Sequence, residues 1–183
     1  MRLTVYTGSS SGLDPLWTET AHALGHALGA GGHHLVYGGG QVGLMGTLAD
    51  AALEAGAPVT GVIPAALVEA EHAHPGLTTL EVVADVGERK RRLADLGEAM
   101  VALPGGAGTL EEFFESWTWQ QLGVHAKPVA LYSPGGFWDP LTGMLDHLVE
   151  SGFLRRSFRE GLIVADTPDG LFRALREWMP PER

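Results

Sequence analysis

The sequence predicts one α/β domain built on a Rossmann-like, doubly wound parallel sheet. Short apolar, β-branched runs alternate with longer stretches that carry apolar residues at helical spacing, along all 183 residues. Clusters of glycine fall where the apolar runs end, as at the strand-to-helix turns of such folds. Neither a composition break nor an internal repeat divides the chain, so we assign residues 1–183 to a single nucleotide-binding domain.

The individual elements follow from the length and period of each apolar run. Short β-branched runs are expected to be strands, and runs with an apolar residue every three or four positions are expected to be helices. The predicted strands are 3–7, 35–37, 59–63, 80–83, 99–103, 129–132 and 162–164. The predicted helices are 16–28, 44–55, 86–97, 109–122, one within 137–152, and 168–179.

The composition excludes several classes of function. A net charge of −10 and a pI near 5.1 disfavour binding to nucleic acids or anionic membranes. The sequence contains no cysteine, so it offers neither a disulfide framework nor a thiolate nucleophile. No apolar run approaches the ~20 residues that span a bilayer, and the first residues do not form a signal-peptide core. We therefore expect a cytoplasmic protein without nucleic-acid or membrane partners.

Three glycine-rich loops are expected at one edge of the sheet, at 8–12, 38–43 and 104–109. Glycine lets the backbone approach a ligand closely, and a helix that starts after such a loop presents free N–H groups to a phosphate. The simpler alternative is that these glycines only turn the chain. None of the loops has the P-loop pattern, and no acidic residue follows 38–43 at the distance that dinucleotide binding requires.

Two charged residues are candidates for the chemistry. Arg89 falls on the apolar stripe of its predicted helix, so its guanidinium needs an anionic partner from the protein or a ligand, unless it reaches solvent at the helix start. Glu112 lies opposite the apolar stripe of the next predicted helix, on a face shared with Trp119 that a ligand or a second subunit would cover. The alternatives are a half-exposed tryptophan and a helix-capping box formed by Thr109 and Glu112.

The histidines do not predict a metal site. His22 and His26 have helical spacing, and His72 and His74 are close in sequence, but no carboxylate completes a metal-binding pattern near either pair. We therefore expect no metal and solvated histidines.

Several segments together resemble the LOG family of cytokinin-activating phosphoribohydrolases. The PGGxGTxxE motif, with a Glu-Arg-Lys run upstream, is the most specific of them, and the resemblance covers roughly 4–155. The segments are VYGGGQVGLMG at 36–46, GVIP at 61–64, ERK at 88–90, PGGAGTLEE at 104–112 and TWQQLG at 118–123.

The resemblance implies a homodimeric enzyme that cleaves cytokinin riboside 5′-monophosphates, and often AMP, to the free base and ribose 5-phosphate without a cofactor. It implies that Arg89 and Glu112 are the catalytic pair. The glycine loops and the resemblance together predict substrate contacts at Gly8, Ser9, Gly39, Gly40, Met45, Glu71, Lys90, Gly105, Gly106, Ala107, Gly108, Thr109, Glu111 and Thr118.

The sequence departs from the family pattern at Thr7, Val86 and Gly87, where the family often has Cys, Met and His. These changes leave the expected catalytic pair in place but bear on base preference. Pyridoxal-dependent lysine decarboxylation, a label often given to this family, needs a Schiff-base lysine, and the chain contains only Lys90 and Lys127.

Glycosidic cleavage builds positive charge on the ribose, and Glu112 is expected to stabilise that charge, orient the hydroxyls or activate water. Arg89 is expected either to pair with Glu112 or to contact the nucleotide. Two other functions are considered: a non-catalytic nucleotide-binding or carrier protein, and an NAD(P) oxidoreductase, which lacks its ribose-binding acid here.

Overall fold

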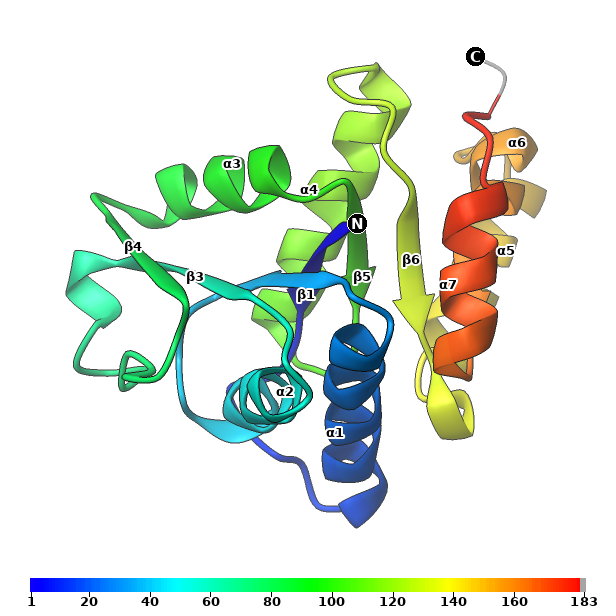
Figure 1. Cartoon of the computed structure of the whole chain (residues 1–183). Coiled ribbons are helices and arrows are strands. Elements are labelled where there is room, and N and C mark those ends of the chain that lie inside the picture. Colours follow the sequence, from blue (N-terminus) through cyan, green and yellow to red (C-terminus); the bar gives the residue numbers. More distant parts are fainter. Residues whose placement is uncertain (182–183) are drawn as a thin grey trace.

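The computed structural model describes residues 1–181, and within them the chain forms one seven-stranded parallel sheet (Figure 1). The strand order is β4-β3-β2-β1-β5-β6-β7, so the predicted doubly wound sheet is confirmed. The strands are β1 Arg2–Tyr6, β2 His34–Tyr37, β3 Val59–Pro64, β4 Thr79–Val83, β5 Ala99–Ala102, β6 Val129–Tyr132 and β7 Ile163–Ala165.

Every predicted helix is present, and one short helix was not predicted. The helices are α1 Pro15–Ala30, α2 Gly43–Glu54, α3 Val86–Leu96, α4 Ala107–Leu122, α5 Asp139–Glu150, α6 Arg156–Glu160 and α7 Pro168–Glu177. Two 3₁₀ turns add η1 Ala65–Leu67 and η2 Pro134–Gly136. The unpredicted helix is α6, whose five residues are too few to show a helical period.

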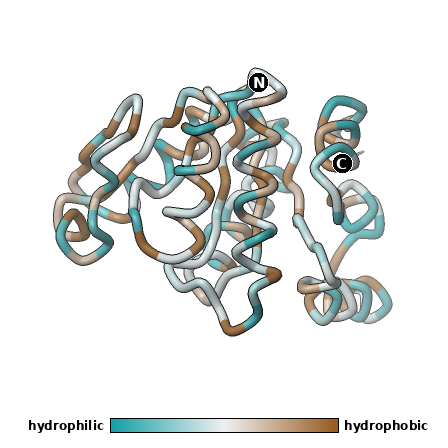
Figure 2. Tube along the Cα trace, turned by 60° about the horizontal axis from the view of Figure 1, so that its bottom comes forward, coloured by the Kyte–Doolittle hydropathy of each residue, from teal (hydrophilic) through white to brown (hydrophobic). Residues whose placement is uncertain are grey.

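Helices cover both faces of the sheet because successive strand residues point to opposite sides. Leu3 and Val5 of β1 join a core with α1, α2 and α7, whereas Tyr6 joins a second core with α3, α4 and α5. Figure 2 shows hydrophilic and hydrophobic positions alternating along the helices, as expected when one side of each packs on the sheet. No helix among residues 1–181 is long and apolar enough to cross a membrane.

Glycine lets α1 and α2 pack unusually close to each other. A Cβ atom at Gly25 would lie 2.5 Å from the carbonyl oxygen of Leu48, and one at Gly29 would lie 2.4 Å from the Cβ of Ala55. Side chains at these positions would push the helices apart, so the glycines fix the position of α2 beneath the loops that line the site.

The connectivity reverses between β1 and β5, and this is where the first and third glycine loops begin. From β1 the chain adds β2, β3 and β4 in one direction, then returns to pair β5 with β1 and continues to β7. Ligands of open α/β sheets bind at such a switch point, beyond the carboxyl ends of the strands. The crossover from β3 to β4 differs from the others, since it holds only η1 and an irregular segment up to Thr78.

Candidate active site

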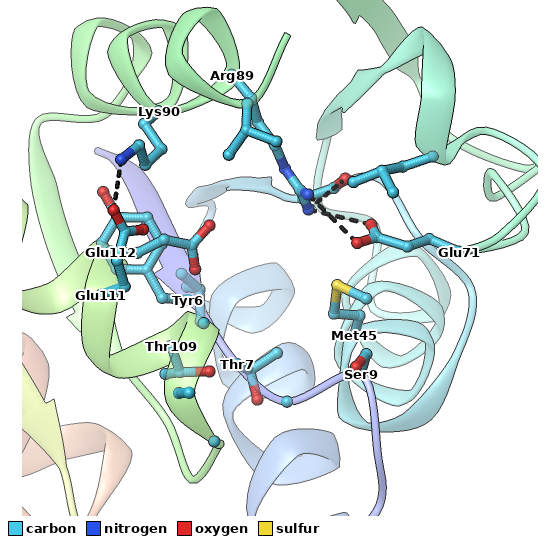
Figure 3. A pocket seen from close by; sticks show the side chains of 18 residues that line it. Tyr6, Thr7, Ser9, Met45, Glu71, Arg89, Lys90, Thr109, Glu111 and Glu112 are labelled. Atoms are coloured by element: carbon cyan, nitrogen blue, oxygen red, sulfur yellow. Dashed lines mark hydrogen bonds and ion pairs between the residues drawn. The ribbon is translucent and has the colours of Figure 1, made fainter.

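A cavity of about 310 Å³ opens at the carboxyl ends of the central strands, where the fold predicts a ligand site (Figure 3). Its walls come from the end of β1, the loops after β2 and β5, the β3–β4 crossover and the starts of α2, α3 and α4. The lining residues are Val5, Tyr6, Thr7, Gly8, Ser9, Gly38, Met45, Leu67, Glu71, Val86, Arg89, Lys90, Gly106, Ala107, Gly108, Thr109, Glu111 and Glu112.

Arg89 is buried and held by two acceptors. It lies one turn into α3, whose start is capped by the Asp85 carboxylate, and its residue is 8% exposed. Its Nη2 donates to the Gly38 carbonyl at 3.0 Å, and Nη1 and Nη2 donate to the two oxygens of Glu71 at 3.3 and 3.2 Å. Figure 3 shows Glu71 and Arg89 pointing toward each other on the side of the cavity that faces Glu112. The anionic partner of Arg89 is therefore Glu71 rather than Glu112.

Glycine at position 38 is required by this arrangement. A Cβ atom there would lie 2.0 Å from Nη2 of Arg89 and 3.3 Å from the sulfur of Met45. The second glycine loop thus leaves room for a guanidinium as well as a backbone turn.

The start of α4 differs from the predicted capping arrangement. The helix begins at Ala107 after Gly106, so Thr109 lies within the first turn, 3% exposed, and cannot be the cap of a Thr109–Glu112 box. The capping alternative is wrong because the glycine loop enters the helix two residues earlier than the apolar pattern indicated. Glu112 is consequently free to line the cavity.

Glu112 has an unusual acidity for a glutamate. Its pKa is raised to about 7, chiefly by burial. Arg89 gives the strongest opposing effect, the carboxylates of Glu111 and Glu71 add to the increase, and Lys90 opposes it. A carboxyl group with a pKa near neutrality can exchange protons at physiological pH, as expected of a general acid or base. The side chain faces the cavity across from Arg89 (Figure 3).

Lys90 lies beside the cavity and is paired with two carboxylates of α4. Its Nζ contacts Glu111 and lies 2.8 Å from Glu115. These two hydrogen bonds raise the pKa of the ammonium group, and the bond to Glu111 has the larger effect. Lys127 donates instead to the carbonyls of Ala94 and Asp95, at 2.6 and 3.2 Å. Lys90 is held in its charged form by its two carboxylates, and Lys127 does not line the cavity, so neither lysine fits the role of a Schiff-base nucleophile.

Most of the residues predicted to contact substrate meet in this cavity. The twelve that line it are Gly8, Ser9, Met45, Glu71, Arg89, Lys90, Gly106, Ala107, Gly108, Thr109, Glu111 and Glu112. Gly39 and Gly40 are buried behind the wall, and Thr118 is exposed on α4. Gly105 lines an adjoining cavity of about 290 Å³ with Trp17 and Phe137. The cavity brings twelve of the predicted residues together, but the roles predicted for all of them, and for the four outlying ones, stay predictions.

Some residues of the cavity were not predicted. Tyr6 and Thr7 end β1 immediately before the first glycine loop, a position that could have marked them as lining residues. The hydroxyl of Tyr6 shares a 2.8 Å hydrogen bond with Ser116 of α4. Leu67 lines the cavity from the β3–β4 crossover, where no helical or strand period in the sequence indicates which way a side chain points. Thr7 and Val86, two departures from the family pattern, both lie in the wall.

The expectation of solvated histidines was right for His22 and His26 but wrong for His74. The first two are exposed on α1, whereas His74 is 5% exposed and lies 2.9 Å from a carboxylate oxygen of Asp50. The sequence did not reveal this pair, because Asp50 on α2 lies 24 residues away from His74. Within residues 1–181, no group of three or more potential ligands could hold a metal ion.

A parallel sheet with glycine loops and a cavity at its switch point defines a Rossmann-like protein with a candidate ligand site at the carboxyl edge of the sheet. The sequence model of a family described as "Possible lysine decarboxylase" matches residues 45–175. Similar proteins include the cytokinin riboside 5′-monophosphate phosphoribohydrolase of Rhodococcoides fascians, 43% identical over 95% of this chain and 88% of that protein. The cytokinin riboside 5′-monophosphate phosphoribohydrolase LOG of Oryza sativa is 41% identical over 98% of this chain and 74% of that protein.

The chain belongs to the LOG family of phosphoribohydrolases. Solved structures of more distant sequence share its fold. A molybdenum cofactor binding protein from Rippkaea orientalis matches with a TM-score of 0.70 and 20% identity, over 96% of this chain and 94% of the other. The molybdenum cofactor carrier protein of Chlamydomonas reinhardtii matches with a TM-score of 0.70 and 21% identity, over 96% of both chains.

Proposed function

We propose that this protein hydrolyses the N-glycosidic bond of adenosine 5′-monophosphates, including N6-modified ones, to the free base and ribose 5-phosphate. The observation that carries the proposal is the Glu112 carboxyl group, with a pKa of about 7, in one cavity with a glycine loop at a helix start. The names of the similar enzymes support the same reaction.

The phosphate is assigned to the start of α4. Backbone N–H groups at the first turn of a helix have no partner within the helix, and the helix dipole adds positive potential there. Gly106, Ala107 and Gly108 lie at this start and line the cavity, with the buried Thr109 beside them. A Cβ atom at Gly106 or Gly108 would meet no atom within 4 Å, so both glycines face open space that a phosphate can occupy.

Glu112 is assigned to the ribose and the attacking water. In its ionised form the carboxylate stabilises the positive charge that develops on the sugar and accepts a proton from water. Arg89 and Glu71 form the facing wall and are assigned to holding the nucleoside against Glu112. Loss of a group that stabilises the transition state commonly lowers turnover about 100-fold or more.

The test is base release from AMP and from isopentenyladenosine 5′-monophosphate, measured by chromatography for the wild type and Glu112→Gln. We expect the wild type to release base from at least one substrate and the variant to lose activity about 100-fold while still binding nucleotide. Glu115→Gln, on the same helix but outside the cavity lining, is the matched control. Nucleotide binding without base release would instead support a carrier function, and near-full activity of Glu112→Gln would refute the mechanism.

The proposal includes a cytoplasmic homodimer. Apolar side chains are exposed at the end of α4, where Leu122 is 71% and Val124 66% exposed. Large exposed apolar side chains are buried when subunits associate, and the lack of cysteine suits a reducing compartment. Light scattering after gel filtration tests this part, since a mass near twice 19.4 kDa is expected and a monomer mass would contradict it.

A further inference from the structure

His74 is a buried histidine that does not line the cavity. Its Nε2 lies 2.9 Å from Oδ1 of Asp50 on α2, and its Nδ1 accepts the backbone N–H of Gly76 at 3.0 Å. Because Nδ1 must keep a lone pair to accept that bond, the ring carries its proton on Nε2 and donates it to Asp50. Both ring nitrogens are therefore used, and the ring ties the β3–β4 crossover to α2.

The backbone around His74 is joined to the second glycine loop. The His74 N–H donates to the Gly39 carbonyl at 2.9 Å, and Ala73 forms an antiparallel bridge with Gly40. The Gln41 N–H is shared between the carbonyls of Glu71 and His72, at 3.1 and 2.9 Å. Residues 71–74 thus lie along 39–41 like a short added strand, and the His74–Asp50 bond fixes the end of that strand.

Glu71 depends on this attachment for its position. It lies in a crossover that contains only the three-residue η1, so no long helix holds it. Its neighbour His72 has a φ of 46°, in the left-handed region that is strained for a residue with a side chain. Such a conformation persists only where surrounding contacts impose it. The carboxylate that this segment presents is the one that binds the Arg89 guanidinium.

We propose that His74 and Asp50 are positioning residues for the reaction, clamping the crossover to α2 so that Glu71 holds Arg89 in the cavity wall. Neither residue lines the cavity. The inference rests on the proposed function, because it assigns a catalytic consequence to the position of Arg89. The proposed chain of contacts begins at the exposed carboxylate of Asp50 on α2 and ends at the buried guanidinium of Arg89.

Asp50→Ala is the primary test, since the Asp50 side chain is 55% exposed and its removal leaves no cavity in the core. We expect kcat/KM for AMP to fall about tenfold, because small displacements of groups that hold a substrate carry large rate costs. Asp50→Asn is expected to restore most of the activity, since its amide oxygen can still accept the His74 proton. Glu54→Ala, an exposed carboxylate further along α2, is the matched control and is expected to behave like the wild type.

The pH dependence distinguishes positioning from a general loss of stability. When Glu71 leaves the wall, it no longer raises the pKa of Glu112, and the freed Arg89 can approach Glu112 and lower it. Glu111 and Lys90, which also face Glu112, stay on α4 and α3. The inflection of kcat/KM against pH is therefore expected to move to lower pH in Asp50→Ala. A lower melting temperature with the wild-type inflection and wild-type kcat/KM would overturn the proposal.

Two substitutions of His74 separate its two bonds. In His74→Asn, the amide oxygen can accept the Gly76 N–H in place of Nδ1, but the side chain is too short to reach Asp50. In His74→Gln, the amide NH2 can donate to Asp50 in place of Nε2. We expect His74→Asn to reproduce the kinetic effect of Asp50→Ala and His74→Gln to be milder. Equal defects in both, with Asp50→Ala unaffected, would overturn the proposal.

The Kd of AMP is measured for the same proteins by calorimetry, so that the two proposals can fail separately. If the wild type binds AMP without releasing base, the proposed hydrolase activity is refuted. The positioning role of His74 and Asp50 is then judged from the Kd of AMP in the variants. In that case a Kd raised severalfold by Asp50→Ala and not by Glu54→Ala supports the clamp, and an unchanged Kd overturns it.

Discussion

The two walls of the cavity are built in different ways. One wall is the start of α4, where Gly106 to Glu112 follow directly from a central strand and are placed by the helix itself. The other wall brings together Gly38, Glu71 and Arg89 from three segments, and side-chain hydrogen bonds hold it. We therefore expect changes in the helix wall to alter chemistry directly, and changes in the assembled wall to act through geometry.

The helix wall carries the largest expected effect on stability. Burial raises the pKa of Glu112 from 4.5 to about 7, so between these values the folded protein binds more protons than the unfolded chain. The free energy of unfolding attributable to Glu112 then decreases as pH rises through this window, and the penalty is complete above pH 7. Glu112→Gln should be more stable than the wild type by up to ~3 kcal/mol at pH 8 and by about 1 kcal/mol or less at pH 5.

Urea unfolding of both proteins at pH 5 and pH 8 measures this difference. Glu115→Gln serves as the control, because Glu115 lies on the same helix but does not line the cavity. A stability gain for Glu112→Gln that is equal at the two pH values would show that the carboxyl group is not buried as described.

The activity of Glu112 has its own pH dependence if the ionised form reacts. We expect kcat/KM to rise with pH and to level off above about 7, the pKa of the carboxyl group. A rate that falls over the same range would assign Glu112 as a general acid that protonates the leaving base instead.

The assembled wall is tested by Arg89→Lys. A lysine ammonium cannot bind both oxygens of Glu71 and the Gly38 carbonyl in the planar geometry of a guanidinium. We expect kcat/KM for the preferred substrate to fall on the order of 100-fold. Arg92→Lys is the matched control, because Arg92 makes a similar two-contact pair with Glu81 on the surface, at 2.6 and 2.9 Å. Equal losses in the two variants would contradict the role of Arg89.

The two walls also differ in how far the sequence could predict them. The helix wall is local: strand, glycine loop and helix follow one another between 99 and 122, so the motif indicated nearly all of its lining residues. The error was confined to the helix start, because glycines carry no apolar period and Gly106 replaced Thr109 as the cap.

The assembled wall depends on contacts between distant parts of the chain. Arg89 meets Glu71 across 18 residues and Gly38 across 51, and His74 meets Asp50 across 24. The burial of Arg89 could be predicted from its place on the helix stripe, but its partner could not. The crossover that presents Glu71 has no helical or strand period, so its path is set by hydrogen bonds to the glycine loop that no local pattern encodes.

Gly38→Ala tests the assembled wall by adding a single methyl group. The new methyl group would lie 2.0 Å from Nη2 of Arg89, so the guanidinium must leave its place, while the backbone can stay. Because the displaced group is the end of a flexible side chain, we expect a small change in melting temperature but a loss of about tenfold in kcat/KM.

Gly143→Ala in α5 is the control for Gly38→Ala, since its methyl group would meet nothing within 4 Å. Steady-state kinetics and thermal unfolding of both variants separate the two walls. If Gly38→Ala kept full activity, the position of Arg89 would not limit the reaction, and catalysis would depend on the helix wall alone. A tenfold loss at unchanged stability would instead show that the wall assembled from distant segments sets the rate through geometry.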